Sequence, residues 1–561
     1  MKYTANAPQG FKYKLKRTVK KIVQPFRISE KDKGKLLYNK FLSMPVNDKF
    51  IFYEAFAGLG ILDNPRAIFK YLLNQEDFKS YTHIWSVENP ELAADNISEF
   101  SSLDNVIIVK RESEDYYKYL ATSKYLINNS TFGYYFEKRN SQVYINTWHG
   151  VPTKYMGYEH TAERVENARG PARNFLLADY LVSANQFMTE VMYKRAYKLD
   201  GLFQGKILEL GHPRSDAIVN ANTLDVHRKL NTAGIHTDKK IILYAPTWKG
   251  TLYNNLDYNV EDFKKTVAKL SENIDTEHYR IYLRVHYFLY KILATDPELR
   301  PMLIPFTIDT NELLSVVDVL ISDYSSIFFD FLATKKPILF YVPDLEEYQS
   351  GRGLYVPVSR LPGYVSSNIN DISITLGNIC TSELVNPIRE KYLERYSKLH
   401  EDMSQWCIYN DDGNSCKRLV DVVFRREPVS ELEGDGVYSV INGLEAHKEK
   451  ILICVNTNYN DMTFYENLRK KLESYEYRTT DVTILTTSFT DTKYKVYFNN
   501  NIPKEVRVLV WYALPYVTKY NQKFFKREIK RSLGNVRFDE VLMEGTLTEY
   551  WAEFGNAIKK L

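Results

Sequence analysis

The sequence has few of the features that mark secreted, zinc-binding or membrane-spanning proteins. Its 561 residues include four cysteines, Cys380, Cys407, Cys416 and Cys454, and no two of them form a CxxC pair. Because no histidine cluster accompanies them, we expect neither a disulfide framework nor a metal site, and we predict reduced cysteines packed inside a cytosolic protein. No uninterrupted apolar run is long enough to cross a bilayer, so we expect no membrane span.

Motifs of the common nucleotide-dependent enzymes are also missing. Neither a GxxxxGKS/T loop nor GxGxxG occurs, which disfavours a P-loop ATPase and an NAD enzyme, and we expect no cofactor. No Asp-x-Asp pair stands where a metal-dependent sugar transferase would place its metal ligands. The formal net charge of +4 is too small to indicate a nucleic acid partner, and 44% apolar content is that of an ordinary globular protein.

The charge is unevenly distributed along the chain, however. Residues 1–29 contain eight Lys or Arg, and the first acidic residue is Glu30. Apolar residues such as Phe11 and Leu15 alternate with these cations, as in segments that lie on an anionic membrane surface. Residues 1–29 are therefore predicted to be either a membrane-surface segment or a solvated basic tail.

Short apolar segments typical of strands alternate with helix-like stretches through most of the chain. This alternation predicts an α/β protein in which helices cover parallel sheets on both faces. The number of strands favours two doubly wound domains over one sheet. The predicted strands are residues 50–56, 82–87, 105–110, 125–130, 142–148, 179–185, 207–213, 240–247, 280–286, 319–325 and 337–343.

Two polar, turn-rich stretches suggest where these domains begin and end. The first, near residues 215–235, divides an N-terminal domain (30–225) from a second domain (226–425). The second forms a charged linker over residues 426–448. A new strand at 450–456 then opens a smaller α/β unit, residues 449–561, in which two further predicted strands, "VTILTTS" and "VRVLVWY", follow.

Side chains that can transfer protons or bind ligands follow several of the predicted strands. Ligands of doubly wound sheets bind beyond the carboxyl ends of the strands, so these positions are candidates for a site. His149 follows one strand directly, and its neutral imidazole could accept a proton near neutral pH, while Gly150 would allow a ligand to approach the backbone. The alternative is a packed histidine beside a turn.

Further candidates for anion binding stand at the ends of later strands. Strand alternation predicts Arg284 and His286 on one face, where they could bind an anion, although a buried histidine bonded to backbone is the alternative. Thr247 offers a hydroxyl past another strand. Ser325 or Ser326 is predicted to begin a helix whose N–H groups suit phosphate, the alternative being a plain N-cap.

Arg214 and Asp216, in "GHPRSD", complete the set of candidates derived from the residues themselves. The guanidinium of Arg214 could bind phosphate with two parallel hydrogen bonds. The alternative interpretation is a structural ion pair between Arg214 and Asp216.

The sequence segments that contain these candidate residues follow one another in the same order as in a known family. "TWHGVPTK", "GHPRSD", "LYAPTW", "LRVH" and "ISDYSSIFFDFL" succeed one another as in the CDP-glycerol glycerophosphotransferase family, which the chain resembles over residues 45–425. "YEAFAGLGILDNPRAIFKYLL" and "PDLEEYQSGRGLY" also resemble it. That family contains teichoic acid primases and polymerases and related capsule enzymes. Ser215 stands where Asn is usual and Tyr287 where Pro often follows, so the resemblance specifies the reaction more closely than the donor polyol.

The resemblance implies a GT-B architecture, with two Rossmann-like domains facing a cleft. It implies transfer of glycerol phosphate or ribitol phosphate from CDP-glycerol or CDP-ribitol to a hydroxyl of a lipid-linked acceptor, with release of CMP. Residues 30–225 would be the acceptor side and residues 226–425 would bind the donor. The enzyme would be peripheral to the cytoplasmic face of the cell membrane, and a homo-oligomer is left open.

The resemblance also implies roles for individual residues. His149 would be the general base, and His286 with Arg284 would stabilise the donor pyrophosphate. Ser325, Ser326 and Thr247 would bind donor phosphate, with Arg214, Asp216 and Asp179 in support.

Other interpretations stay open at this point. Residues 449–561 loosely resemble the first half of a second GT-B glycosyltransferase, and the alternative is a small accessory domain. For the whole chain, the alternatives are a GT-B glycosyltransferase that uses a nucleotide sugar and a non-catalytic, membrane-associated scaffold.

Overall fold

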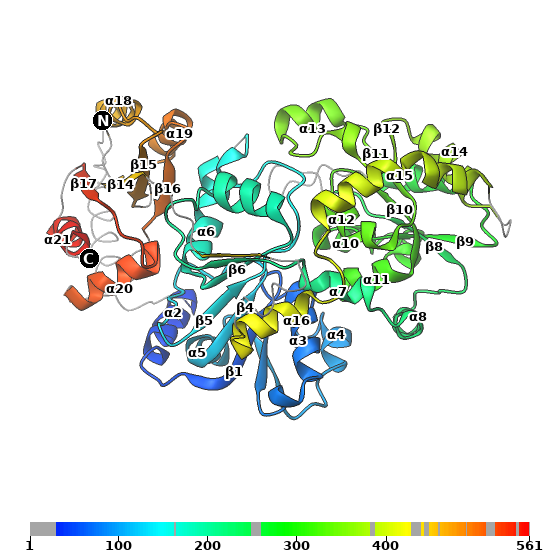
Figure 1. Cartoon of the computed structure of the whole chain (residues 1–561), viewed down its shortest axis with the longest axis horizontal. Coiled ribbons are helices and arrows are strands. Elements are labelled where there is room, and N and C mark those ends of the chain that lie inside the picture. Colours follow the sequence, from blue (N-terminus) through cyan, green and yellow to red (C-terminus); the bar gives the residue numbers. More distant parts are fainter. Residues whose placement is uncertain are drawn as a thin grey trace, which may run out of the picture.

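The described residues form three β-sheets with helices packed around them (Figure 1). We call the parts built on them the first domain, the second domain and the C-terminal unit. The predicted membrane-surface segment, residues 1–29, lies outside the described residues. The computed structural model describes residues 30–161, 164–247, 260–381, 387–427, 439–442, 448–457, 461–487, 489, 491–511, 522–545 and 549–559.

The first domain is built on an eight-stranded sheet in the order β13-β7-β6-β5-β4-β1-β2-β3. Its strands are parallel except β13, which pairs antiparallel with β7 at the edge. A parallel sheet is covered by helices on both faces, and its strands are accordingly apolar and buried, as at Ile51, Phe52 and Tyr53. The strands are β1 (Asn47–Glu54), β2 (Thr82–Val87), β3 (Val106–Lys110), β4 (Ser123–Asn128), β5 (Val143–Asn146), β6 (Tyr180–Ser183), β7 (Lys206–Glu209) and β13 (Ser439–Asn442), and the helices are α2 (Glu30–Phe41), α3 (Asp63–Leu73), α4 (Ala94–Ser98), α5 (Glu114–Thr122), η3 (Gly157–Glu159), α6 (Arg164–Leu177), the π-helical η4 (Met188–Ala196), η5 (Pro213–Ser215) and α7 (Asp216–Val219).

The second domain has a five-stranded parallel sheet in the order β12-β11-β10-β8-β9. Its central strand β10 is apolar and buried at Val319, Leu320 and Ile321. The strands are β8 (Lys240–Tyr244), β9 (Tyr279–Leu283), β10 (Val317–Ser322), β11 (Ile338–Tyr341) and β12 (Tyr364–Ser366), and the helices are α8 (Thr223–Thr232), α9 (Val260–Ser271), α10 (Tyr287–Leu293), α11 (Thr310–Val316), α12 (Ile327–Phe331), η7 (Leu332–Thr334), α13 (Leu345–Gly351) and α14 (Ile369–Ile379).

The chain then returns from the second domain to the first. The long helix α15 (Pro387–Cys407) leads to α16 (Ser415–Val420) and η9 (Asp421–Arg425), and α16 packs against α3 of the first domain (Figure 1). Cys416, Leu419 and Val423 are buried there in one apolar cluster with β1. The expectation that all of residues 226–425 belong to the second domain therefore differs from the structure. An apolar stripe shows that a helix must be covered, but not which sheet covers it.

The C-terminal unit has a four-stranded parallel sheet in the order β16-β15-β14-β17. Its strand β16 lies next to α6 of the first domain, and α20 also contacts α6. Tyr158 donates a hydrogen bond of 2.6 Å to the carbonyl of Val508, which joins the two parts. The strands are β14 (Glu449–Val455), β15 (Thr480–Thr486), β16 (Arg507–Val510) and β17 (Glu540–Glu544), and the helices are α18 (Met462–Glu473), α19 (Thr492–Asn501), α20 (Gln522–Leu533) and α21 (Glu549–Ile558).

The predicted class, an α/β protein of GT-B type with two Rossmann-like domains, is confirmed. Each strand predicted between residues 50 and 343 is present, with ends shifted by a few residues. The four cysteines are buried and unpaired. Among the described residues, no helix is long and apolar enough to cross a membrane, and no group of His, Cys, Asp and Glu is arranged to bind a metal ion.

Candidate active site

A cleft of about 580 Å³ lies between the first and second domains, where the carboxyl ends of their strands face each other. His149 and Lys154 line it from the first domain, and Thr247, His286 and Ser326 line it from the second. Seven of the nine predicted site residues meet in this cleft: His149, Arg214, Thr247, Arg284, His286, Ser325 and Ser326.

His149 is held with one ring nitrogen turned toward the backbone. Its Nδ1 lies 2.7 Å from the carbonyl oxygen of Asn129, which can accept a hydrogen bond but not donate one. Nδ1 therefore carries the proton and Nε2 is left as an acceptor. Burial lowers the pKa of His149, partly opposed by this hydrogen bond, so the imidazole is neutral near pH 7. A neutral imidazole with an acceptor nitrogen is the form that a general base requires.

The backbone around His149 is strained. Trp148, whose ring stacks on that of His149 with the centroids 4.2 Å apart, has a φ of +48°. Phe56 and Ala57, from the loop after β1, and Asp63, the first residue of α3, also have positive φ, which costs a non-glycine residue about 1 kcal/mol or more. Strain of this kind persists where packing imposes it, and here it is concentrated at the cleft.

Gly150 allows the two domains to approach each other. Its φ is +150°, and a Cβ at this position would lie 3.1 Å from Ser326 Oγ and 3.2 Å from Arg214 Nη2. A larger residue would therefore push the His149 loop away from the second domain.

Arg214 binds carboxylates rather than facing the cleft with free donors. It makes two parallel hydrogen bonds to Asp330 of α12, of 3.1 and 2.8 Å, and one of 2.7 Å to Asp63 of α3. It also donates to the carbonyl of His149 at 2.7 Å. Burial raises the pKa of Asp330 to about 6, although Arg214 opposes the shift. Arg214 thus joins the two domains and fixes the His149 loop, and the predicted phosphate contact would have to compete with these bonds.

Asp216 and Asp179 lie outside the cleft, contrary to the prediction that they support the site. Asp216 does not pair with Arg214, because its carboxylate accepts from the N–H groups of Ser415 and Cys416, at 3.0 and 2.8 Å. Asp179 precedes β6, at the opposite end of the sheet from the cleft, and it accepts from the N–H of Tyr144 at 2.7 Å and pairs with Lys138. Both carboxylates therefore accept hydrogen bonds from backbone N–H groups and stabilise the fold.

His286 and Arg284 both line the cleft, but they have different hydrogen-bond partners. His286 directly precedes α10 as its N-cap, and its Nδ1 accepts from the N–H of Phe288 at 3.5 Å, which leaves the proton on Nε2. Burial and the nearby Lys154 lower the pKa of His286. Arg284 donates to the carbonyls of Pro305 and Ile308, at 2.8 and 2.9 Å, so it mainly holds this loop. Strand β9 ends at Leu283, and alternation therefore does not extend to these residues.

Asp323 organises the phosphate-binding candidates Thr247 and Ser325 of the second domain. This buried carboxylate accepts from the N–H and the hydroxyl of Thr247, at 2.7 and 2.5 Å, and from the N–H of Ser325 at 3.1 Å. Ser326 occupies the first position before α12, but within the described residues its side chain makes no capping hydrogen bond. Its hydroxyl faces Gly150 across the cleft.

Sequence reasoning did not single out Lys154 and Arg352, which add positive charge to the cleft. Burial, with Arg352 nearby, lowers the pKa of Lys154 to about 8. Both residues lie inside segments that carry the family resemblance, "TWHGVPTK" and "PDLEEYQSGRGLY". The same segments could therefore have identified them, since a cation beside a proposed general base suits a phosphorylated substrate.

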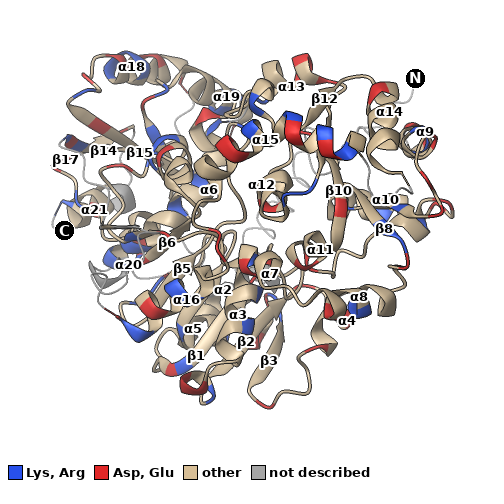
Figure 2. Cartoon of the chain, turned by 45° about the vertical axis from the view of Figure 1, so that its right-hand side comes forward, with Lys and Arg blue, Asp and Glu red and all other residues tan. Residues whose placement is uncertain are grey.

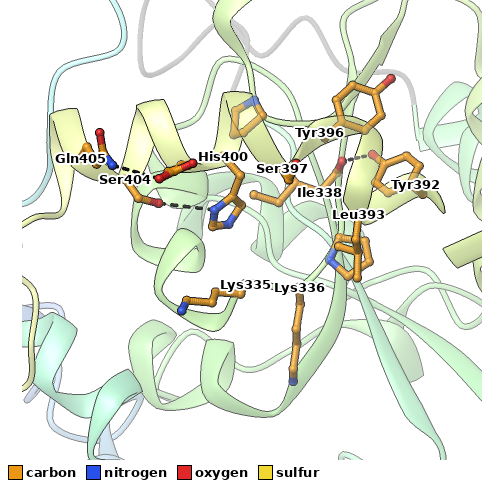
Figure 3. Close-up of a pocket in the computed structure, with 13 residues that line it drawn as sticks. Lys335, Lys336, Ile338, Tyr392, Leu393, Tyr396, Ser397, His400, Ser404 and Gln405 are labelled. Atoms are coloured by element: carbon orange, nitrogen blue, oxygen red, sulfur yellow. Dashed lines mark hydrogen bonds between the residues drawn. The ribbon is translucent and has the colours of Figure 1, made fainter. Parts of the chain in front are cut away.

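A second hollow, of about 550 Å³, lies on the other side of the second domain (Figure 3). His400 points into it from α15, opposite Lys335 and Lys336. It contains none of the predicted site residues, so we do not assign it to the active site.

The fold and the cleft define the class of the protein: a transferase of GT-B type, whose site lies between two Rossmann-like domains. The family model for CDP-Glycerol:Poly(glycerophosphate) glycerophosphotransferase matches residues 36–425, and the chain belongs to this family.

Individual relatives agree with this assignment. The chain is 32% identical over 395 residues to a teichoic acid poly(glycerol phosphate) polymerase of Bacillus spizizenii, covering 67% of this chain and 92% of the relative. It is 26% identical over 431 residues to a teichoic acid glycerol-phosphate transferase of Staphylococcus aureus, covering 73% of this chain and 100% of the relative. A polymerase of Staphylococcus epidermidis is 29% identical, but the match covers 51% of that longer protein and 68% of this chain.

A solved structure shares the fold. The wall teichoic acid polymerase TagF matches with a TM-score of 0.58 and 26% identity, over 76% of this chain and 100% of the TagF chain. Another TagF structure, of a variant with one histidine replaced by asparagine, was soaked with CDPG.

Proposed function

We propose that this enzyme transfers glycerol phosphate or ribitol phosphate from a CDP-polyol to a hydroxyl of a lipid-linked acceptor and releases CMP. The polymer would be a teichoic acid or a capsule-type chain. The observation that carries the proposal is the neutral His149, with Nε2 left to accept a proton, in one cleft with Lys154, Arg352 and His286. Relatives named for glycerol phosphate and for ribitol phosphate both support a CDP-polyol donor and leave the polyol open.

In the proposed reaction, Nε2 of His149 accepts the proton of the acceptor hydroxyl. The oxygen attacks the phosphorus that carries the polyol, and the bond from this phosphorus to the oxygen of CMP breaks, with the electron pair leaving on CMP. The Nε2–H of His286 would donate a hydrogen bond to the pyrophosphate, and Lys154 and Arg352 would neutralise its charge. The hydroxyls of Ser325, Ser326 and Thr247 would bind donor phosphate.

The two domains would divide this work. The first domain, which carries His149, would bind the acceptor, and the second domain would bind the donor. Because the acceptor is lipid-linked, the protein would be peripheral to the cytoplasmic face of the membrane, with residues 1–29 on its anionic surface.

The test is CMP release from CDP-glycerol and from CDP-ribitol with a short lipid-linked acceptor. We expect activity in the wild type and a loss of about two orders of magnitude or more in His149→Ala and in His286→Ala. His278→Ala, which changes an exposed histidine of the second domain, is the matched control and should retain activity.

Three outcomes would contradict the proposal. Release of a nucleotide from a nucleotide sugar, without CMP release, would favour a GT-B glycosyltransferase. CMP release that is unchanged in His149→Ala would show that the proposed base does not act, and a folded protein inactive with every donor would favour a scaffold.

A further inference from the structure

A third cavity, separate from the cleft and from the hollow beside α15, lies between the first domain and the C-terminal unit. Its volume is about 990 Å³, against about 580 Å³ for the cleft. One wall is formed, after the His149 loop, by Tyr155, Tyr158–Thr161 and Arg164, and the opposite wall by Asn499, Asn500, Lys504 and Glu505, at and after the end of α19. This second wall lies beyond residues 36–425, so the cavity combines the family fold with a part of the chain that the family model does not match.

Positive charge predominates in this interdomain cavity. Arg164, Lys198 and Lys504 line it together with two acids, Glu159 and Glu505. Glu159 already binds Arg195 at 2.6 Å, so its charge is largely compensated. Figure 2 shows basic residues on both sides of the junction, on α6 and next to α19.

The cations are held in place by backbone groups that do not neutralise them. Arg164 donates to the carbonyl of Ile502, and Lys198 donates to those of Lys504 and Val506. Burial, with Arg507 and Arg164 nearby, lowers the pKa of Lys198 to about 7, although Glu505 and Asp481 oppose the shift. A bound anion would oppose both the burial and the neighbouring cations, and so would favour the charged form of Lys198.

The cavity and the cleft share a wall. Lys154 lines the cleft and the next residue, Tyr155, lines the cavity. The segment is fixed to the second domain by the N–H of Tyr155, which donates to Gly353 at 3.2 Å, and by Tyr355, which donates to Glu159 at 2.5 Å. The cations of the cavity therefore lie next to Lys154 and Arg352 of the cleft, on the two sides of the same segment.

We propose that this cavity binds the phosphodiester backbone of the growing polyol phosphate chain, behind the hydroxyl that reacts at His149. The inference rests on the proposed function and names a subsite for its acceptor. A chain with one negative charge in each repeat can contact the cleft and the cavity at once, and the second contact strengthens the first. The cavity should therefore affect the affinity for long acceptors and not the chemical step.

The experiment compares a lipid-linked acceptor that carries one polyol phosphate unit with one that carries a long chain. For the wild type, KM should be lower with the long acceptor and should rise with salt. Lys504→Glu and Lys198→Ala should each raise KM for the long acceptor about tenfold, with kcat and the one-unit acceptor unchanged. Lys470→Ala, an exposed lysine of α18, is the matched control. Lys504 is exposed, so its replacement should not disturb folding.

A binding measurement separates this inference from the proposed reaction. A labelled glycerol phosphate oligomer without lipid should bind the full chain, and Lys504→Glu should weaken it about tenfold even if no CMP release is found. Equal oligomer affinity in wild type, Lys504→Glu and Lys198→Ala would overturn the inference. The inference would also be overturned if the two variants lost binding to anionic vesicles but kept their affinity for the oligomer, because the cavity would then bind lipid headgroups.

Discussion

At the residue scale, the His149 ring is oriented before any substrate arrives. The carbonyl of Asn129 holds Nδ1, and the ring of Trp148 covers one face. Arg214 binds the carbonyl of His149 itself, so the backbone is fixed as well as the side chain. A base that is oriented in advance does not lose conformational freedom in the transition state.

The pH dependence of activity should report the lowered pKa of His149. Burial disfavours the imidazolium, so the neutral base persists below the usual histidine pKa of about 6.5. We expect kcat/KM to stay constant as the pH falls to about 6.5 and to decline below it, as His149 becomes protonated. The measurement is a kcat/KM profile with a donor and acceptor that do not titrate in this range. An acidic limb centred above pH ~6.5 would contradict the assignment.

Site residues that follow a recognisable strand could be predicted from the sequence. Ion pairs between residues far apart in the chain could not. His149, His286, Ser325 and Thr247 each follow a recognisable apolar strand, so their place at the cleft could be predicted. Arg214 pairs with Asp63 and Asp330, which are 151 and 116 positions away in the sequence. Nothing in the segment "GHPRSD" itself identifies these partners.

At the element scale, Asp216 shows how one carboxylate can connect distant segments. It accepts from the first N–H groups of α16, whose N-terminus carries partial positive charge. Helix α16 in turn covers the apolar face of α3. The cap therefore helps to fix the return of the chain from the second domain to the first.

Replacement of this cap should destabilise the protein without removing the catalytic groups. Asp216→Ala leaves two buried N–H groups without their acceptor, at a cost of about 1 to 3 kcal/mol. We expect a lower thermal midpoint and faster proteolysis between α15 and η9, with KM values close to wild type for the folded protein. Asp225→Ala, on α8, is the control. An unchanged midpoint would show that the cap is dispensable.

The strands that the sequence did not predict share a physical reason. β12 has three residues, and β13 lies in a stretch that composition marks as a linker. β17, Glu540–Glu544, begins and ends with a charged residue. Each is at the edge of its sheet, where strands are often short or charged, so the apolar signal in the sequence is weak.

At the scale of the whole molecule, ion pairs hold the two large domains together beyond the cleft. Glu312 of α11 binds Arg66 and Lys70 of α3, at 3.0 and 2.6 Å. Lys229 of α8 binds Glu99 of the first domain at 2.8 Å and Glu312 at 3.2 Å. Burial alone would raise the pKa of Glu312, but the three cations hold it well below its usual value. These pairs stabilise the observed arrangement of the two domains, in which His149 faces the second domain.

Removal of residues 1–29 should weaken binding to anionic vesicles, because the segment contains eight cations and no acid. The difference from the full chain should be largest at low salt and should shrink as salt screens the charges. Co-sedimentation with anionic vesicles measures it, and vesicles of uncharged lipid are the control. Equal binding by both proteins at low salt would show that this segment is a solvated tail.

The strand β13 has a consequence for how this molecule can be divided. The family match ends at residue 425, yet the outer edge of the eight-stranded sheet is completed by residues 439–442, on the way to the C-terminal unit. A protein cut at the end of the family match would leave unpaired those N–H and C=O groups of β7 that face away from β6, and such an edge can recruit a strand from another chain. The unit of homology and the unit of folding therefore end at different residues.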